Sequence, residues 1–288
     1  SQGLLVWAED INKASGGRVI IEFYNPGTIC AEGDIYEAVR HGLVDIGNHN
    51  VTRNRGNFPL ARVMDMPFIY SRAEAGAVST WRLYDKYPEL QKEFAETHIL
   101  TFWSSAIDQV HSSKKPLGTL EEIKGAQIGA FSGSNTDMAV ALGASAVQIS
   151  PSDLYLSLQR SQVDGVFCPF AYMRSTKVYE AAKHSYVVNM KANGFYLTMN
   201  KDVWNRLPAD IQRIITDLSG EKLARHQGRV TDKGALDDLE FMLSEGQTVT
   251  KVPPAEVARW AERAESITAD WLKECEGKGL KIARELLE

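Results

Sequence analysis

The sequence predicts an α/β fold organised around a parallel sheet. Residues 127–167 contain three short apolar runs, Gln127–Phe131, Val147–Ile149 and Val163–Phe167, and a helix-like stretch separates each run from the next. Short apolar runs between turn residues are typical of buried strands, and a βαβαβ order makes such strands parallel neighbours in one sheet. A chain of 288 residues with 44% hydrophobic residues can bury two cores of ordinary size. We therefore predict two α/β domains, with ligand-binding loops at the carboxyl ends of the strands.

The helices inside this unit have recognisable end signals. Ser134 stands three residues before Asp137, so each side chain can satisfy an end amide of the other residue. Gly143 can close the first helix in a left-handed turn, and Ser152 or Asp153 can cap the second helix. These signals support the alternation of strand and helix.

Helical and extended patterns also alternate before this unit. Leu4, Trp7 and Ile11 share one helical face, and a proline inside a helix predicts a break at Tyr87-Pro88. The expected elements are a helix over residues 4–14, strands over Val19–Tyr24 and Val44–Gly47, a helix from about Arg72 to His98 with that break, and a strand over Leu100–Ser104.

The chain after Tyr172 is expected to return to the first domain. Asn193-Gly194 is a turn pair that bends the chain before an alternating strand. Helical spacing begins near Pro208 and continues with little interruption to about Ser244, long enough to cross both domains. The expected elements are a helix through Lys183, strands over Tyr186–Met190 and Phe195–Met199, the long helix, and a last helix that carries Trp260 and Trp271.

Composition excludes several classes of function. A net charge of −5 and a pI of about 5.8 argue against nucleic-acid binding, which needs a basic face. The sequence has no apolar run of about 20 residues, the length that spans a bilayer. It also lacks a CxxC motif, a GxGxxG fingerprint and clustered metal-ligand residues, so no metal or cofactor is expected. The enzyme alternative would use Cys168 as a nucleophile with His49 or His111 as its base.

Four long segments resemble solute-binding proteins of TRAP (tripartite ATP-independent periplasmic) transporters. The central unit carries two of them, KPLGTLEEIKGAQIG and LGASAVQISPSDLYLSLQRSQVDGVFCP. GGRVIIEFYNPGTICAEGDIYEAVRHGLVDIG precedes it, and MNKDVWNRLPADIQRII follows it. Together they cover nearly the whole chain in the family's order, so the sequence is identified as a member of this DctP-like family.

The resemblance implies a two-domain periplasmic binding protein, type II-like, with a ligand cleft between domains and a long helix spanning both. The expected domains are residues 1–108 plus 197–240 and residues 109–196 plus 241–288. The family opens with a strand before the first helix, so a strand ahead of residue 1 is expected. The implied partners are a small organic solute and the small and large membrane subunits of a TRAP permease, and the implied state is a periplasmic monomer.

Three polar anchors of the family are replaced in this chain. The arginine that ends the family's "GlkiR" strand and grips the ligand carboxylate in a bidentate pair is Gly129 here. A second arginine position is Gln109. The asparagine before the "DG..p" proline is Cys168, and the residue before it is Phe167 instead of a polar residue. The resemblance therefore implies a pocket shifted towards apolar or neutral ligands.

The remaining candidate ligand residues are aromatic, polar or basic. Asn50 and Arg53 match family positions that often face the ligand, and Trp103 and Phe131 offer rings for stacking. Asn193 and the loop residue Ser132 complete the set. We hypothesise a neutral, cationic or aromatic ligand, also because Gly129 should leave free volume next to Phe131. The alternative is an organic acid, a carboxylate or sulfonate, met by Arg53 or by the backbone amides of Ser132–Ser134.

Overall fold

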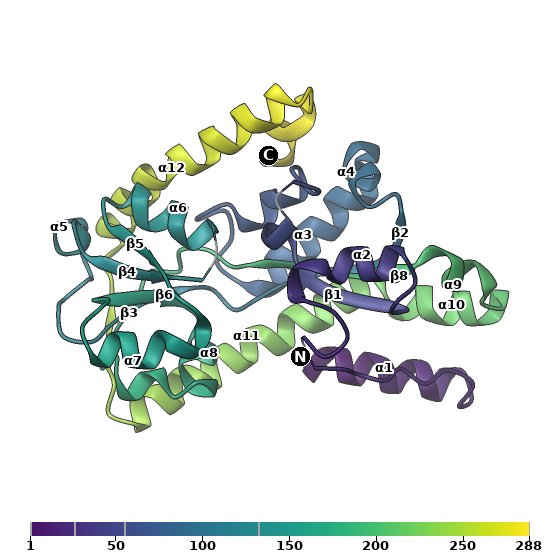
Figure 1. The fold of residues 1–288 in the computed structure, drawn as a ribbon, viewed down its shortest axis with the longest axis horizontal. Helices are drawn as coiled ribbons and strands as arrows, with labels where there is room; N and C mark the ends of the chain where they lie inside the picture. Colours follow the sequence, from purple (N-terminus) through teal and green to yellow (C-terminus); the bar gives the residue numbers. More distant parts are fainter. Residues whose placement is uncertain (1, 26, 55, 132, 288) are drawn as a thin grey trace. The chain divides into compact units, whose positions relative to one another are not determined.

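The chain divides into two compact α/β units, each built from discontinuous segments (Figure 1). The structure is a computed structural model that describes residues 2–25, 27–54, 56–131 and 133–287, and for Arg53 and Asn54 it describes the backbone alone. Unit 1 comprises Ser1–Met64, Ala73–Ser105 and Asn193–Thr231, and unit 2 comprises Asp65–Arg72, Ala106–Ala192 and Asp232–Glu288. The domain boundaries predicted from the sequence, which place Asp65–Arg72 in the first domain, remain a prediction.

Unit 1 is built on a three-stranded antiparallel sheet. Its strand order is β1 (Ile46–Asn50), β8 (Gly194–Asn200), β2 (Thr97–Ser104), so the central strand comes late in the sequence. The helices of the unit are α1 (Gln2–Ala14), α2 (Ile35–Arg40), α3 (Ala73–Lys86), α4 (Pro88–Glu93), α9 (Lys201–Arg206) and α10 (Ala209–Leu218), with 3₁₀ turns at Glu32–Asp34, Val51–Asn54 and Ala61–Asp65.

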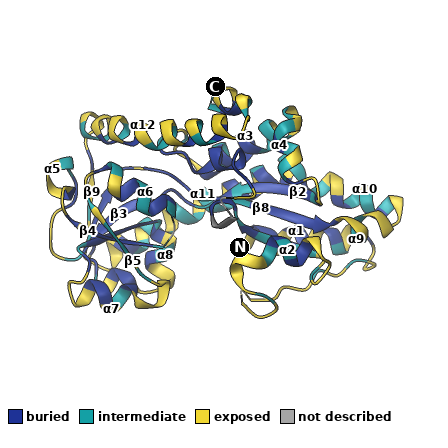
Figure 2. Ribbon diagram, turned by 45° about the horizontal axis from the view of Figure 1, so that its top comes forward, coloured by how far each residue is buried: buried dark blue, intermediate teal, exposed yellow. Residues whose placement is uncertain are grey.

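Both faces of this sheet are packed. On one face, Leu197 and Met199 of β8 lie in a core with Trp7 of α1 and Ile211 of α10. On the other face, Tyr196 of β8 joins an aromatic cluster that includes Tyr36, Phe58, Tyr84, Phe94 and Phe102. Figure 2 shows β2 and β8 as largely buried strands, with exposed residues on the outer sides of α1 and α10. The sheet is therefore held rigidly from both sides.

Unit 2 contains a six-stranded mixed sheet in the order β5-β4-β6-β3-β7-β9. Strand β4 is parallel to both β5 and β6, which confirms the parallel unit expected from the sequence. The strands are β3 (Gln109–Ser112), β4 (Gln127–Ala130), β5 (Ser145–Gln148), β6 (Gly165–Cys168), β7 (His184–Val187) and β9 (Thr248–Lys251). The helices are α5 (Leu120–Ile123), α6 (Gly133–Ala141), α7 (Leu154–Gln159), α8 (Phe170–Ser175) and α12 (Pro254–Gly277), with 3₁₀ turns at Pro151–Asp153, Val178–Glu180 and Lys281–Leu287.

Helices cover both faces of this sheet as well. Helix α6 lies on one side, and α7 and α8 lie on the other (Figure 1). The first side holds a core that includes Ile128, Met138 and Trp260, and the second side holds one that includes Leu154, Val166 and Met173. Helix α11 (Gly220–Ser244) contributes its residues up to Thr231 to unit 1 and the rest to unit 2.

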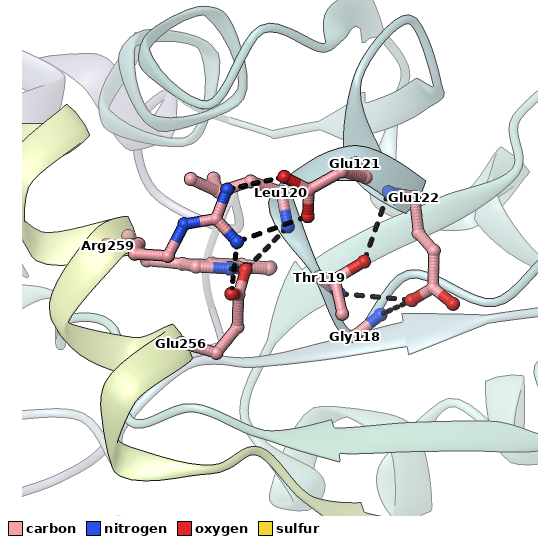
Figure 3. Close-up of polar contacts among 8 residues, drawn as sticks. Gly118, Thr119, Leu120, Glu121, Glu122, Glu256 and Arg259 are labelled. Atoms are coloured by element: carbon pink, nitrogen blue, oxygen red, sulfur yellow. Dashed lines mark hydrogen bonds and ion pairs between the residues drawn. The ribbon is translucent and has the colours of Figure 1, made fainter.

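A polar clasp joins α12 to the start of α5 (Figure 3). Glu256 Oε1 accepts hydrogen bonds from the backbone N–H of Leu120 at 2.7 Å and from Trp260 Nε1 at 2.9 Å. Arg259 bridges Glu256 and Glu121. Thr119 and Glu122 form a reciprocal capping box on the same turn. Helix α12 is thus attached to α5 by partly buried and exposed polar contacts, as well as by the apolar face that carries Trp260 and Ala264.

Several local predictions were wrong in detail. Val19–Tyr24 is extended but forms no ladder with another described segment, because β propensity needs a partner strand to become a sheet. Strand β1 begins later than expected and includes Asn48–Asn50, which were expected to follow it. The predicted continuous helix to Ser244 breaks at Gly220, whose φ of 61° lies in the left-handed region. The helix expected through Lys183 ends at Ser175.

Candidate functional site

A row of three half-buried side chains crosses the sheet of unit 1. Phe195 at the start of β8 pairs in register with Asn50 at the end of β1 and with Trp103 near the end of β2. Directly opposed residues of antiparallel strands point to the same face of the sheet. All three side chains are partly exposed, unlike the packed residues farther along the same face. The fold therefore brings together Asn50 and Trp103, two of the residues predicted from the sequence.

The rings in this row form a stacked pair. The Trp103 and Phe195 rings lie 4.2 Å apart between centroids with an interplanar angle of 11°. The Trp103 indole Nε1 donates a hydrogen bond to Oδ1 of Asn48 at 2.7 Å. Asn50 Oδ1 accepts hydrogen bonds from the backbone N–H of Thr52, at 2.8 Å, and from its hydroxyl. The result is an ordered aromatic platform flanked by two amides on one strand.

Asn48 and Phe195 were not among the candidate residues predicted from the sequence. The sequence placed Phe195 in a predicted strand. Alternation predicts a strand, but it does not show which of its residues the helices leave uncovered. Asn193 lies beside this platform, in the turn that leads into β8: its N–H donates to Ser105 Oγ at 2.9 Å, and its carbonyl accepts from the Ser105 N–H at 2.9 Å. Asn193 therefore holds the start of β8 against the end of β2.

A second aromatic surface lies in unit 2, at the carboxyl ends of parallel strands. Phe131 follows β4, Ile149 follows β5, and Tyr172 lies in α8 just after β6. The Phe131 and Tyr172 rings are 5.1 Å apart, and the Tyr172 hydroxyl donates to the Pro151 carbonyl at 3.2 Å. Burial raises the pKa of Tyr172 to about 12, so the phenol stays neutral. This edge is where open α/β sheets usually bind ligands.

The volume expected beside Gly129 is already occupied. A Cβ atom at this position would lie 2.5 Å from Ile149 Cδ1 and 3.4 Å from Leu154 Cδ1. Both of these residues belong to, or pack against, the apolar core under α7. The expectation of free volume next to Phe131 was wrong, because the side chain after the neighbouring strand fills it. The place where the family's arginine would begin is therefore apolar and closed.

Three other predicted residues are buried inside unit 2. Phe167 is 1% exposed within the core beneath α6, and Cys168 is 3% exposed within the core beneath α7 and α8. Gln109 is 5% exposed, and its amide binds the loop after β7: Oε1 accepts from the N–H groups of Val188 and Asn189, and Nε2 donates to Asn189 Oδ1 at 2.7 Å. These contacts give Gln109 a role in holding that loop. Ligand contact by Phe167, Cys168 or Gln109 stays a prediction.

Two further predictions fall where the structure gives no side-chain description. Ser132 lies outside the described residues, and so does the side chain of Arg53, whose backbone lies in the 3₁₀ turn Val51–Asn54. Gly133 and Ser134 form the start of α6, and Ser134 is buried. Binding of an anion by this loop or by Arg53 therefore stays a prediction.

The geometry around Cys168 does not favour a nucleophile. Burial, together with the nearby Asp108 charge, raises the pKa of the Cys168 thiol well above its usual value, which disfavours the reactive thiolate. His111 Nε2 lies 3.0 Å from the main-chain carbonyl of Cys168, and its Nδ1 lies 2.8 Å from Ser185 Oγ. Burial lowers the pKa of His111 to about 4, so the ring is neutral. The imidazole is thus a buried structural link between strands β3, β6 and β7.

The described residues contain no cluster of three or more His, Cys, Asp or Glu side chains that could hold a metal ion. None of the helices in the described ranges combines the length and the hydropathy that a membrane span requires.

Comparison with known families decides the class of protein. Residues 1–274 match the model of the DctP family, described as bacterial extracellular solute-binding protein, family 7. This chain belongs to that family. The match spans both units, so it agrees with the resemblance of all four sequence segments and confirms the family predicted from them.

Solved structures of TRAP solute-binding proteins share the two-domain fold. A protein from Rhodoferax ferrireducens T118, solved with copurified benzoate, is 25% identical; the alignment covers 99% of this chain and 89% of that one with a TM-score of 0.90. A protein from Bordetella bronchiseptica with bound (R)- and (S)-mandelate is also 25% identical, with coverage of 99% and 90% and a TM-score of 0.86. Among curated relatives, the outer membrane transporter protein TsaT of Comamonas testosteroni is 24% identical over 95% of this chain and 81% of its own length.

Proposed function

We propose that this member of the DctP family is the extracytoplasmic receptor of a TRAP transporter for an aromatic solute. It binds the solute, delivers it to the membrane subunits of the permease and catalyses no reaction. The observation that carries the proposal is the stacked Trp103–Phe195 pair, half-exposed on the sheet of unit 1 beside Asn48 and Asn50. Stacked rings offer a large apolar contact area, and amides beside them give a ligand its orientation.

The aromatic surface of unit 2 supports the same ligand class. Phe131 and Tyr172 lie where parallel strands end, and Ile149 keeps the neighbouring position apolar. Benzoate and mandelate, the compounds bound in two structures that this chain resembles, each contain a benzene ring. The two aromatic surfaces of this chain therefore suit compounds that, like benzoate and mandelate, contain a benzene ring.

The charge of the ligand is the point on which two versions of the proposal differ. We favour a ligand that does not depend on a bidentate arginine, hence a neutral aromatic compound, because Gly129 stands in the arginine position. A buried carboxylate without a charged partner loses several kcal/mol of hydration free energy. The second version keeps an aromatic acid, in line with benzoate and mandelate, and assigns its carboxylate to Arg53 or to the amides of residues 132–134.

Calorimetric titration separates these versions. The panel contains succinate, benzoate, a neutral aromatic and a cationic aromatic compound, each tested against the wild-type chain and Arg53→Ala. The favoured version predicts weak or undetectable succinate binding and aromatic binding that survives in Arg53→Ala. Submicromolar succinate binding that is lost in Arg53→Ala would contradict it. Recovery of each compound unchanged after incubation checks that the protein is a receptor and not an enzyme.

Ligand-dependent closure of the two units completes the proposal. A hinged pair of units can shift from an open to a closed ensemble only if the ligand binds the closed state more tightly. Small-angle scattering at saturating ligand is expected to give a smaller radius of gyration than scattering without ligand. An unchanged radius with a ligand that binds in calorimetry would rule out closure as the capture mechanism.

A further inference from the structure

We infer that Asn48 and Asn50 act as a pair of oriented hydrogen-bond donors that select aromatic compounds carrying an oxygen acceptor group, and reject aromatic compounds carrying a donor cation. The inference rests on the proposed function and names the chemistry of its ligand. It follows from the hydrogen bonds that the side-chain oxygens of Asn48 and Asn50 already accept.

The orientation of the Asn48 amide is set by the indole beside it. An indole N–H can only donate, so the amide atom 2.7 Å from Trp103 Nε1 must be the oxygen, Oδ1. The oxygen and nitrogen of an asparagine amide are distinguished by their hydrogen-bond partners, and a partner that can only donate identifies the oxygen. Since Oδ1 and Nδ2 project from opposite sides of the amide carbon, the NH₂ group of Asn48 points away from the indole nitrogen.

The Asn50 amide is oriented in the same way by the backbone. The N–H of Thr52 is a donor only, so the amide atom at 2.8 Å is again Oδ1. The Thr52 hydroxyl adds a second hydrogen bond to the same oxygen. Both acceptor sites of the Asn50 oxygen are thereby used, and the NH₂ group remains for a ligand.

The two NH₂ groups lie on one face of one strand. Residues two apart on a strand point to the same side and stand about 7 Å from each other along the chain. Phe195 is directly opposite Asn50, and the Trp103 indole donates a hydrogen bond to Asn48, so both donors lie beside the stacked rings, on the β1 side. A ring that stacks on this platform places its substituent against donors. A carboxylate, nitro or carbonyl group accepts from them, whereas an amidinium or ammonium group meets other hydrogens.

Three planar compounds of nearly equal shape test this chemistry: benzoate, nitrobenzene and benzamidinium. Calorimetry on the wild-type chain is expected to show benzoate and nitrobenzene binding at least about tenfold more tightly than benzamidinium. Asn48→Asp and Asn50→Asp keep the Oδ1 acceptor for Trp103 or Thr52 but replace the NH₂ group with a carboxylate oxygen. Each variant is expected to weaken nitrobenzene and benzoate by at least about tenfold and to strengthen benzamidinium. Asn205→Asp, on the exposed side of α9, is the control for added charge and should change none of the three affinities.

The outcomes separate this inference from the proposed function. If none of the three compounds binds the wild-type chain, the aromatic ligand class fails and the inference fails with it. If they bind, but the Asp variants keep the wild-type order of affinities, the inference alone is overturned. Thermal unfolding of each variant checks folding. If an Asp variant does not fold, Asn48→Ala and Asn50→Ala take its place, and the inference then predicts that benzoate and nitrobenzene lose their advantage over benzamidinium.

Discussion

A methyl group added at Gly129 tests how tightly the arginine position is closed. The new Cβ of Gly129→Ala would lie 2.5 Å from Ile149 Cδ1, well inside normal van der Waals separation. Because the clashing atom is the end of a side chain, Ile149 can leave its preferred rotamer, at a cost of about 0.5–1.5 kcal/mol. Replacing glycine with alanine at a compatible position stabilises by about 0.4–1 kcal/mol through the unfolded state. We expect Gly129→Ala to be neutral or destabilising by up to about 1 kcal/mol.

Ile149→Val provides the decisive background, because it removes the Cδ1 atom that the new methyl group would meet. In that background Gly129→Ala should become stabilising by about 0.5 kcal/mol, which gives a favourable coupling of about 1 kcal/mol between the two sites. Urea unfolding of the four proteins measures this coupling. Gly234→Ala is the matched control, since a Cβ at Gly234 in α11 meets no atom within 4 Å, and it should combine additively with Ile149→Val. Additive effects of Gly129→Ala and Ile149→Val would refute the filled position.

Two further predictions concern pH and stability. Burial opposes the charged form of Glu256, but hydrogen bonds from Leu120 and Trp260 and the Arg259 charge outweigh it and lower the carboxyl pKa. Glu256→Gln should therefore destabilise unit 2 by about 1 kcal/mol at pH 7. The difference in stability from the wild type should shrink as the pH falls below 4.5, because the wild-type carboxylate becomes protonated as the pH approaches its lowered folded pKa. Urea unfolding that gives the same difference at pH 7 and pH 3 would contradict this prediction. Burial lowers the pKa of His111 from 6.5 to about 4. As the pH falls, the imidazole is therefore protonated in the unfolded chain before it is protonated in the folded chain. The free energy of unfolding of the wild type should decrease by about 3 kcal/mol between pH 6.5 and pH 4. His111→Asn should not show this decrease. Equal slopes of unfolding free energy against pH for the wild type and His111→Asn would contradict the prediction.

The sequence predicted the parallel unit well because its signals are local. Gly143 does adopt a positive φ, of 82°, and the strands near 127, 147 and 165 pair as the βαβαβ order requires. The strands outside this unit were less predictable. Val19–Tyr24 has every local feature of a strand and forms no ladder, whereas β3 and β9 were missed because pairing with β6 and β7 stabilises them. A ladder depends on a partner that is distant in sequence, and no local pattern reveals it.

The candidate site was predicted only in part, again because some of its residues are brought together by strands that are distant in sequence. Asn50 was a candidate because it matches a family position that often faces the ligand, and Trp103 because its ring can stack. Phe195 joins them only through the antiparallel register of β8. Phe167 and Cys168 were predicted as ligand contacts from their matched positions, and the alternation of β6 directs their side chains into the two packed cores on opposite faces of the sheet. Free volume at Gly129 could not be judged from the sequence, because the residue that fills it follows a different strand.

The structure of the protein purified without refolding, with whatever solute it retains, tests the central claim most directly. The account predicts electron density for an aromatic ring stacked on Trp103 and Phe195, with an oxygen acceptor within hydrogen-bond distance of Asn48 or Asn50 Nδ2. A bound aliphatic dicarboxylate held by Arg53, with no contact to the Trp103–Phe195 pair, would contradict it.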